Sequence, residues 1–155
     1  MPSKSGVKVR QNFVSNSSSS SFIVIGNSGT YEKVHSNEND EYIFGQDGET
    51  EFGWTPQDIT DIDSRINFCK IQSTYLDGKY DDVIEQVIRK NSSVQTFNNC
   101  MSPDWDYDSS QKYSYIDHQS AAIEGQNLEM FESESTLEKF IFDSGSYIHT
   151  DNDNH

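Results

Sequence analysis

Three aspartates alternate with two aromatic residues about two thirds of the way along the chain. The segment 104–108 contains Asp104, Trp105, Asp106, Tyr107 and Asp108. In an extended segment the three carboxylates would share one face, and carboxylate oxygens are the ligands that Ca²⁺ and Mg²⁺ prefer. A calcium loop also needs glycine at its sixth position and an acid at its twelfth, where Ser109 and Tyr115 stand. A metal site on the three aspartates is therefore kept only as an alternative, and no metal or cofactor is predicted.

The same five residues, Asp104 to Asp108, fit a recognition surface better. Tryptophan and tyrosine are the side chains that most often anchor protein–protein interfaces, and charged neighbours steer the partner. We therefore predict that residues 104–108 bind a partner with a basic surface.

A second polar group, Asp117, His118 and Ser120, combines an acid, a base and a hydroxyl. Nucleophilic catalysis needs a hydroxyl activated by a base that a third group orients. Ser120 lacks the glycine-flanked turn that exposes such a nucleophile, and a histidine two residues away is rarely its base. We favour a polar strand end, and keep as the alternative a small metal-assisted hydrolase or nuclease-like enzyme that uses Asp117 and His118.

Charge divides the chain of 155 residues into two parts. The first acidic residue is Glu32, and Lys4, Lys8 and Arg10 give the preceding segment a charge of +3. Since the whole chain carries -15, the remainder carries -18. An acidic body repels phosphate, so direct binding to nucleic acid is not expected. No run approaches the ~18 apolar residues of a membrane helix, and we expect a cytoplasmic protein that does not bind membranes.

The most distinctive segment is 8–24, where a basic pair precedes Phe-Val-Ser-Asn, five serines and an apolar run. Serine hydroxyls compete for backbone hydrogen bonds, so the serines predict a linker, a modification site or an anion-binding loop. The candidate functional residues of this arm are Lys8, Arg10, Phe13, Ser17, Ser18 and Ser19.

This signature resembles the N-terminus of a loose group of bacteriophage and bacterial proteins of uncharacterised activity. The resemblance covers about a tenth of the chain. It implies a phage or prokaryotic origin and the cytoplasm of a bacterial host, and it carries no chemistry with it.

Local patterns predict the elements that must position these residues. Leu, Ile, Val and Phe make up roughly a fifth of the chain, close to the ~20 % below which a highly charged chain is disordered. They gather in short periodic segments, which favours a folded domain. We expect strands at 20–26, 113–118 and 146–149, a hairpin of 41–44 with 51–54, and helices at 56–75, at 80–90 and from 135 to about 145.

Together these elements predict an α+β fold, with a small, mostly antiparallel sheet packed against two to three helices. We expect a flexible basic arm at 1–21, a single domain at 22–150 and a frayed acidic tail at 151–155. The predicted function is that of an acidic, phage-type, non-enzymatic binding or inhibitor protein. Its partner would be a host or phage protein with a basic surface, in the first place a nucleic-acid-handling host protein. Besides the enzyme, a virion or assembly component stays open.

Overall fold

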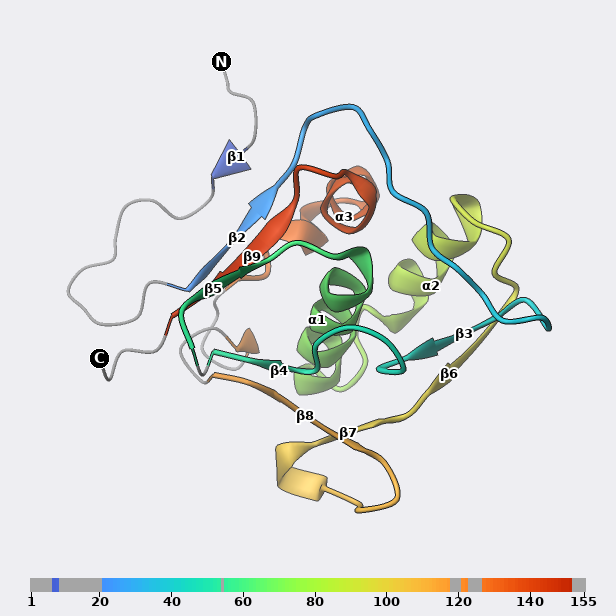
Figure 1. Ribbon diagram of the computed structural model, residues 1–155, viewed down its shortest axis with the longest axis vertical. Coiled ribbons are helices and arrows are strands. Elements are labelled where there is room, and N and C mark those ends of the chain that lie inside the picture. The colour runs from blue at the N-terminus through green and yellow to red at the C-terminus, as the bar shows by residue number, and fades with distance from the viewer. Residues whose placement is uncertain (1–6, 9–20, 54, 118–120, 123–126, 152–155) are drawn as a thin grey trace.

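The computed structural model describes residues 7–8, 21–53, 55–117, 121–122 and 127–151. Helix α1 (Ile62–Tyr75) runs through the middle of the molecule. Helices α2 (Asp81–Lys90) and α3 (Glu134–Phe142) both contact it, and short strands surround the three helices (Figure 1). The predicted α+β class is confirmed.

One sheet is antiparallel and has four strands, in the order β1 (Val7–Lys8), β2 (Phe22–Ile25), β9 (Tyr147–Thr150) and β5 (Gln57–Ile59). Along β2 and β9 alternate residues are buried, as expected for strands with one face on a core. Strand β9 lies between two strands from the first half of the chain, so this sheet joins the two ends of the fold.

Two smaller sheets are parallel. In one, β3 (Glu41–Phe44) pairs with β6 (Thr96–Asn99). In the other, β8 lies between β4 and β7; the bounds of these strands are Lys112–Ile116, Glu51–Phe52 and Met101–Pro103.

The predicted hairpin of 41–44 with 51–54 is wrong, because β3 and β4 pair with different strands. The turn between them is attached to α1 instead. The N–H of Gly45 donates to Asn67 Oδ1 at 2.8 Å, and that of Glu49 donates to Ser64 Oγ at 2.7 Å. The chain therefore wraps around the helix rather than folding back on itself.

Helix α2 confirms the prediction for 80–90, but the other two helices begin elsewhere. The N-cap of α1 is Asp61, whose carboxylate accepts from Ser64 N, and residues 57–59, predicted as helix, form β5. Helix α3 begins at Glu134, one residue before the predicted start, and its N-cap Ser133 accepts from Thr136 N. Among the described residues no helix is long and apolar enough to cross a membrane.

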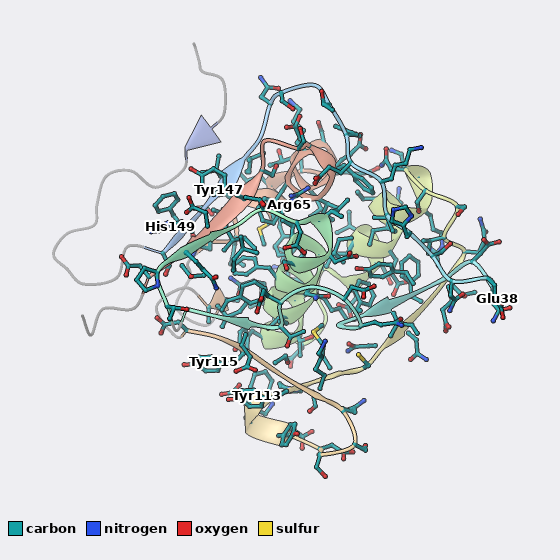
Figure 2. All side chains as sticks on the ribbon, in the orientation of Figure 1. Glu38, Arg65, Tyr113, Tyr115, Tyr147 and His149 are labelled. Carbon is teal, nitrogen blue, oxygen red and sulfur yellow. The ribbon has the colours of Figure 1, made fainter. Side chains whose placement is uncertain are left out.

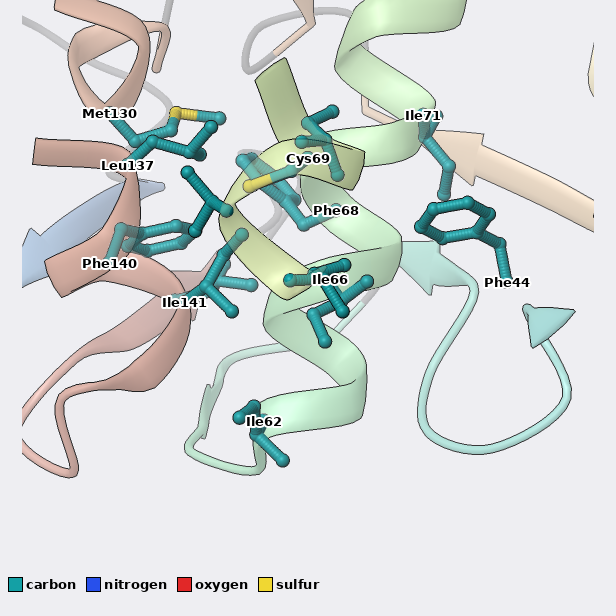
Figure 3. Packing of buried hydrophobic residues seen from close by; sticks show 14 of the residues in the cluster. Phe44, Ile62, Ile66, Phe68, Cys69, Ile71, Met130, Leu137, Phe140 and Ile141 are labelled. Atoms are coloured by element: carbon teal, nitrogen blue, oxygen red, sulfur yellow. The ribbon is translucent and has the colours of Figure 1, made fainter. Parts of the chain in front are cut away.

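Helix α1 is buried around most of its circumference. Ile66, Phe68 and Cys69 pack into the core with α3 (Figure 3). Arg65, Asn67 and Gln72 are equally buried. A buried polar group destabilises the fold unless it has a partner, and these side chains each form hydrogen bonds with the segments that surround the helix.

The guanidinium of Arg65 is the centre of this polar network. Its Nε donates to the carbonyls of Phe140 and Ile141 at 2.9 and 3.1 Å, and Nη1 donates to Ser146 O at 3.3 Å. Its Nη2 forms an ion pair with Glu32. These contacts join α1 to the end of α3, to the turn before β9 and to the segment after β2.

A second polar junction lies at Asp143, just after α3. Its Oδ1 accepts from the N–H groups of Gly145 and Ser28 at 2.8 and 3.1 Å, and its Oδ2 accepts from Gly29 N at 2.9 Å. Gly26 is required beside it, since a Cβ there would lie 2.5 Å from Asp143 Oδ1. Burial raises the pKa of Asp143, but the hydrogen bonds from Gly145, Ser28 and Gly29 outweigh it and lower the pKa overall.

Candidate functional site

The connection between β7 and β8 projects from the body of the protein (Figure 1). The two strands are parallel, with Met101 opposite Lys112, so residues 104–111 must return along the strand before β8 begins. Parallel strands usually need a crossover of a dozen or more residues. This shorter connection folds into the 3₁₀ turn η1 (Asp104–Asp106) followed by a bend, and stands out beside the sheet. We call residues 104–108 the acidic–aromatic loop.

Both aromatic residues of the acidic–aromatic loop are more than half exposed, Trp105 at 57 % and Tyr107 at 51 %. Each rests against a ring of the body. The centroid of Trp105 lies 5.1 Å from that of Tyr75 at the end of α1, and Tyr107 meets Tyr113 of β8 edge-on at 5.5 Å. Figure 2 shows Tyr113 and Tyr115 on the same side of the molecule as the loop. Each of the two rings thus packs against a ring of the body on one side and stays open to solvent on the other.

The three aspartates of the loop do not share a face, which corrects the expectation of an extended segment. Asp106 is exposed, whereas Asp108 Oδ1 accepts from the N–H and hydroxyl of Ser110, both at 2.9 Å. Those hydrogen bonds lower the pKa of Asp108. Because η1 turns the backbone, the carboxylates diverge. In the part of the chain that the structure describes, no group of three or more acidic, histidine or cysteine side chains could hold a metal ion.

Asp104 differs from the other two aspartates of the acidic–aromatic loop. It is half-buried, and its Oδ1 is shielded from solvent while receiving no hydrogen bond from any described residue. An ionised oxygen that is dehydrated without a donor is unfavourable. The described residues therefore leave Oδ1 of this carboxylate without a donor.

A cavity of about 520 Å³ lies beside Asp104, where the end of α1 meets η1 and β8. We call it the Tyr75–Trp105 cavity. Its described lining residues are Thr74, Tyr75, Asp77, Asp104, Trp105, Tyr115, Ile116 and Ala121. Its volume falls in the ~300–1,000 Å³ range of ligand sites. Rings and aliphatic groups supply the apolar part of its wall, and two carboxylates supply its charge.

The aromatic wall is held in place by the backbone of β8. The hydroxyl of Tyr75 accepts from Ile116 N at 3.1 Å and lies 3.4 Å from the Ile116 carbonyl. Burial raises the pKa of Tyr75 to about 12; the contact with the Ile116 carbonyl lowers it, and the charge of Asp104 raises it. The phenol therefore stays neutral at physiological pH and presents a fixed ring to the cavity.

The end of α1 adds further negative potential. A helix C-terminus carries a partial negative charge that basic residues in the last turn usually offset. Helix α2 has Arg89 and Lys90 there, whereas α1 has no basic residue in its last turn. No basic residue occurs among the described residues that line the cavity, so the site as a whole favours a cation.

The structure describes only part of the other predicted sites. Asp117 follows β8, and its N–H donates to Phe52 O at 2.9 Å. His118 and Ser120 lie outside the described residues, so a catalytic role for this group stays a prediction. In the arm, Lys8 belongs to β1, while Arg10, Phe13 and Ser17–Ser19 lie outside the described residues.

Sequence reasoning missed the body's contribution to the cavity. Tyr75 and Asp77 stand at the end of a predicted helix, and Tyr115 stands within a predicted strand, so local pattern assigned them no further role. Only the packing of η1 against α1 brings them to Trp105. A weak signal was present, since α1 ends at Tyr75, Asp77 follows two residues later, and the last turn contains no lysine or arginine.

Comparisons with known proteins add no functional assignment. A scan against protein-family models finds no match, and searches of curated proteins and of solved structures find no significant similarity.

Proposed function

We propose that this chain is a non-enzymatic binding protein that docks through its acidic–aromatic loop on the basic surface of a partner protein. A nucleic-acid-handling protein is the class of partner that carries such a surface. In that case the chain acts as an inhibitor by occupying sites that otherwise bind phosphate.

The observation that carries the proposal is the exposure of Trp105 and Tyr107 on a projecting loop. Large aromatic side chains are usually buried, and when they are exposed beside charged residues they commonly anchor an interface. Here each ring has a firm support underneath, in Tyr75 and Tyr113. Supported rings lose little conformational entropy on binding, which favours affinity.

Charge supports the same proposal. The chain from Glu32 onward carries -18, and an acidic surface accelerates encounter with a basic protein at low salt. Asp106 adds an exposed carboxylate between the two aromatic anchors. The charge of the whole body would steer the partner, and the acidic–aromatic loop would fix the orientation in which it binds.

The test uses the full chain as bait in a bacterial lysate, followed by reconstitution with each purified candidate. We expect direct binding by a protein with a basic surface, weakening as salt rises from 50 to 500 mM because exposed charges are screened. The double variant Trp105→Ala/Tyr107→Ala should weaken that binding by about a hundredfold, the loss of two interface anchors.

A matched control separates the loop from overall charge. Glu38 is exposed and lies well away from η1 (Figure 2). Glu38→Gln should change the dissociation constant by less than about twofold, whereas Asp106→Asn, with the same change of charge, should weaken binding more. A reconstituted partner that binds the double aromatic variant as tightly as the original chain would show that the loop is not the docking surface.

A further inference from the structure

We propose that the Tyr75–Trp105 cavity binds the guanidinium group of an arginine side chain presented by the partner protein. The inference rests on the proposed function and deepens it, because it names the group that the site recognises. It stands on three observations at one place: the aromatic wall, two carboxylates in a lining whose described residues include no basic one, and the Oδ1 oxygen of Asp104 that receives no hydrogen bond from a described residue.

The aromatic wall favours a cation with a flat face. Tyr75, Trp105 and Tyr115 line the cavity, and tryptophan and tyrosine rings attract cations placed over their faces. A guanidinium is planar and more weakly hydrated than an ammonium, so it stacks on rings and leaves water more readily. The cavity volume of about 520 Å³ also accommodates the arginine stem.

The carboxylates supply the charge that an arginine requires. Asp77 and Asp104 both line the cavity, and Asp77 lies just beyond the negative end of α1. No described lining residue is basic, so no cation of the wall competes with the ligand. A guanidinium presents several N–H donors in a fixed fork that matches a carboxylate.

Asp104 is the lining residue that most specifically favours a ligand with such a donor. Its Oδ1 is shielded and receives no hydrogen bond from the described part of the chain. Asp104 also lines the cavity, so a guanidinium bound there lies beside this carboxylate. Its positive charge would offset that of a carboxylate that receives no hydrogen bond at Oδ1 from the described residues.

The test is a titration with N-acetyl-arginine amide, followed by NMR of the indole N–H of Trp105 and the amide of Ala121. N-acetyl-citrulline amide is the matched probe, because it has the same shape without the charge. We expect saturable shifts of both signals with the arginine probe in the millimolar range, and none with the citrulline probe. Equal shifts with both probes would overturn the proposal.

Two neighbouring variants sharpen the result. Asp104→Asn preserves shape and should weaken binding of the arginine probe about tenfold, the loss expected for a charge-assisted hydrogen bond. Asp106→Asn removes the same charge from an exposed position of the same turn and should change it less than twofold. Equal weakening by both variants would mean non-specific attraction and would also overturn the proposal.

The proposed function fails in a distinguishable way. If the arginine probe does not saturate, yet a basic partner still depends on Trp105 and Tyr107, the cavity proposal fails and the docking surface stands. If the probe binds as expected but reconstituted partners ignore the loop, the cavity recognises guanidinium and the docking surface is elsewhere.

Discussion

Helix α1 and the acidic–aromatic loop both place polar groups against apolar ones, but the polar groups differ in their hydrogen bonding. Along α1 the buried amide of Asn67 uses both of its ends, accepting from Gly45 N and donating to the carbonyls of Asp47 and Glu49. In the loop, Asp104 keeps an oxygen that is shielded and receives no hydrogen bond from a described residue. The rings differ too, since Phe68 is buried and Trp105 is 57 % exposed.

The difference separates groups that serve stability from groups that are open to a ligand. A satisfied polar network fixes one arrangement of the core, because any slip leaves a buried donor or acceptor without a partner. Residues that are left exposed or uncompensated weaken the fold slightly and persist where they serve binding. Substitutions along α1 should therefore reduce the free energy of unfolding, and substitutions in the loop should mainly reduce binding.

The largest effect is expected at Arg65. Arg65→Met removes the donors to Phe140, Ile141 and Ser146 and leaves Glu32 without its cation. The loss of hydrogen bonds to several buried carbonyls, together with one half of an ion pair whose Glu32 side is partly exposed, should lower the free energy of unfolding by about 3–5 kcal/mol. Urea denaturation measures it. Arg89→Met, at a surface pair with Glu85, is the control and should cost less than about 1 kcal/mol. Equal losses from Arg65→Met and Arg89→Met would show that the Arg65 network contributes no more to stability than a surface ion pair.

The next effect is expected at Asn67. Asn67→Ala leaves Gly45 N and two carbonyls without partners, and should lower the free energy of unfolding by about 2–4 kcal/mol. Exposed Asn39→Ala should change it by less than about 0.5 kcal/mol. A loss at Asn67 below about 1 kcal/mol would mean that water replaces the amide, and that α1 does not hold the turn after β3.

Asp143 gives a smaller, pH-dependent effect. Asp143→Asn removes an acceptor for Gly29 N and should lower the free energy of unfolding by about 1–3 kcal/mol at pH 7. The folded state lowers the pKa of Asp143. Its ionised form therefore stabilises the fold above the unfolded pKa of about 4, and this contribution is lost as the pH falls through the lower folded value. The gap between original chain and variant, measured from pH 6 to 2, should narrow below about pH 4. A constant gap would contradict the role of its charge.

Local sequence patterns were enough for α2, β8 and β9. Each combines periodic apolar residues with end signals of its own, so a short window contains the information. Patterns failed where a distant segment decides the structure. Thr55-Pro56 is a good helix start in isolation, yet Gln57–Ile59 becomes β5 because it pairs with β9 at the other end of the chain. The prediction of a hairpin failed for the same reason, because the turn after β3 forms its hydrogen bonds with α1.

The candidate site was predictable only in part. The composition of residues 104–108 indicated a recognition surface, and Trp105 and Tyr107 are indeed exposed. The segment forms η1, and its carboxylates diverge. Both features depend on the path by which the chain returns from the end of β7 to the start of β8. The cavity depends on three elements at once, and no single stretch of sequence contains it.

The smallest expected effect has the opposite sign and tests the comparison most directly. Asp104→Asn removes a shielded charge near the negative end of α1, and relief of that repulsion should raise the free energy of unfolding by up to about 1 kcal/mol. Urea denaturation of the variant, with Asp106→Asn as the control, measures it. The same substitution should weaken the arginine probe, so stability and binding would change in opposite directions. If Asp104→Asn instead destabilises the protein by as much as Asn67→Ala, Asp104 is a satisfied structural group like those of α1. The polar groups of the loop would then stabilise the fold in the same way as those of α1.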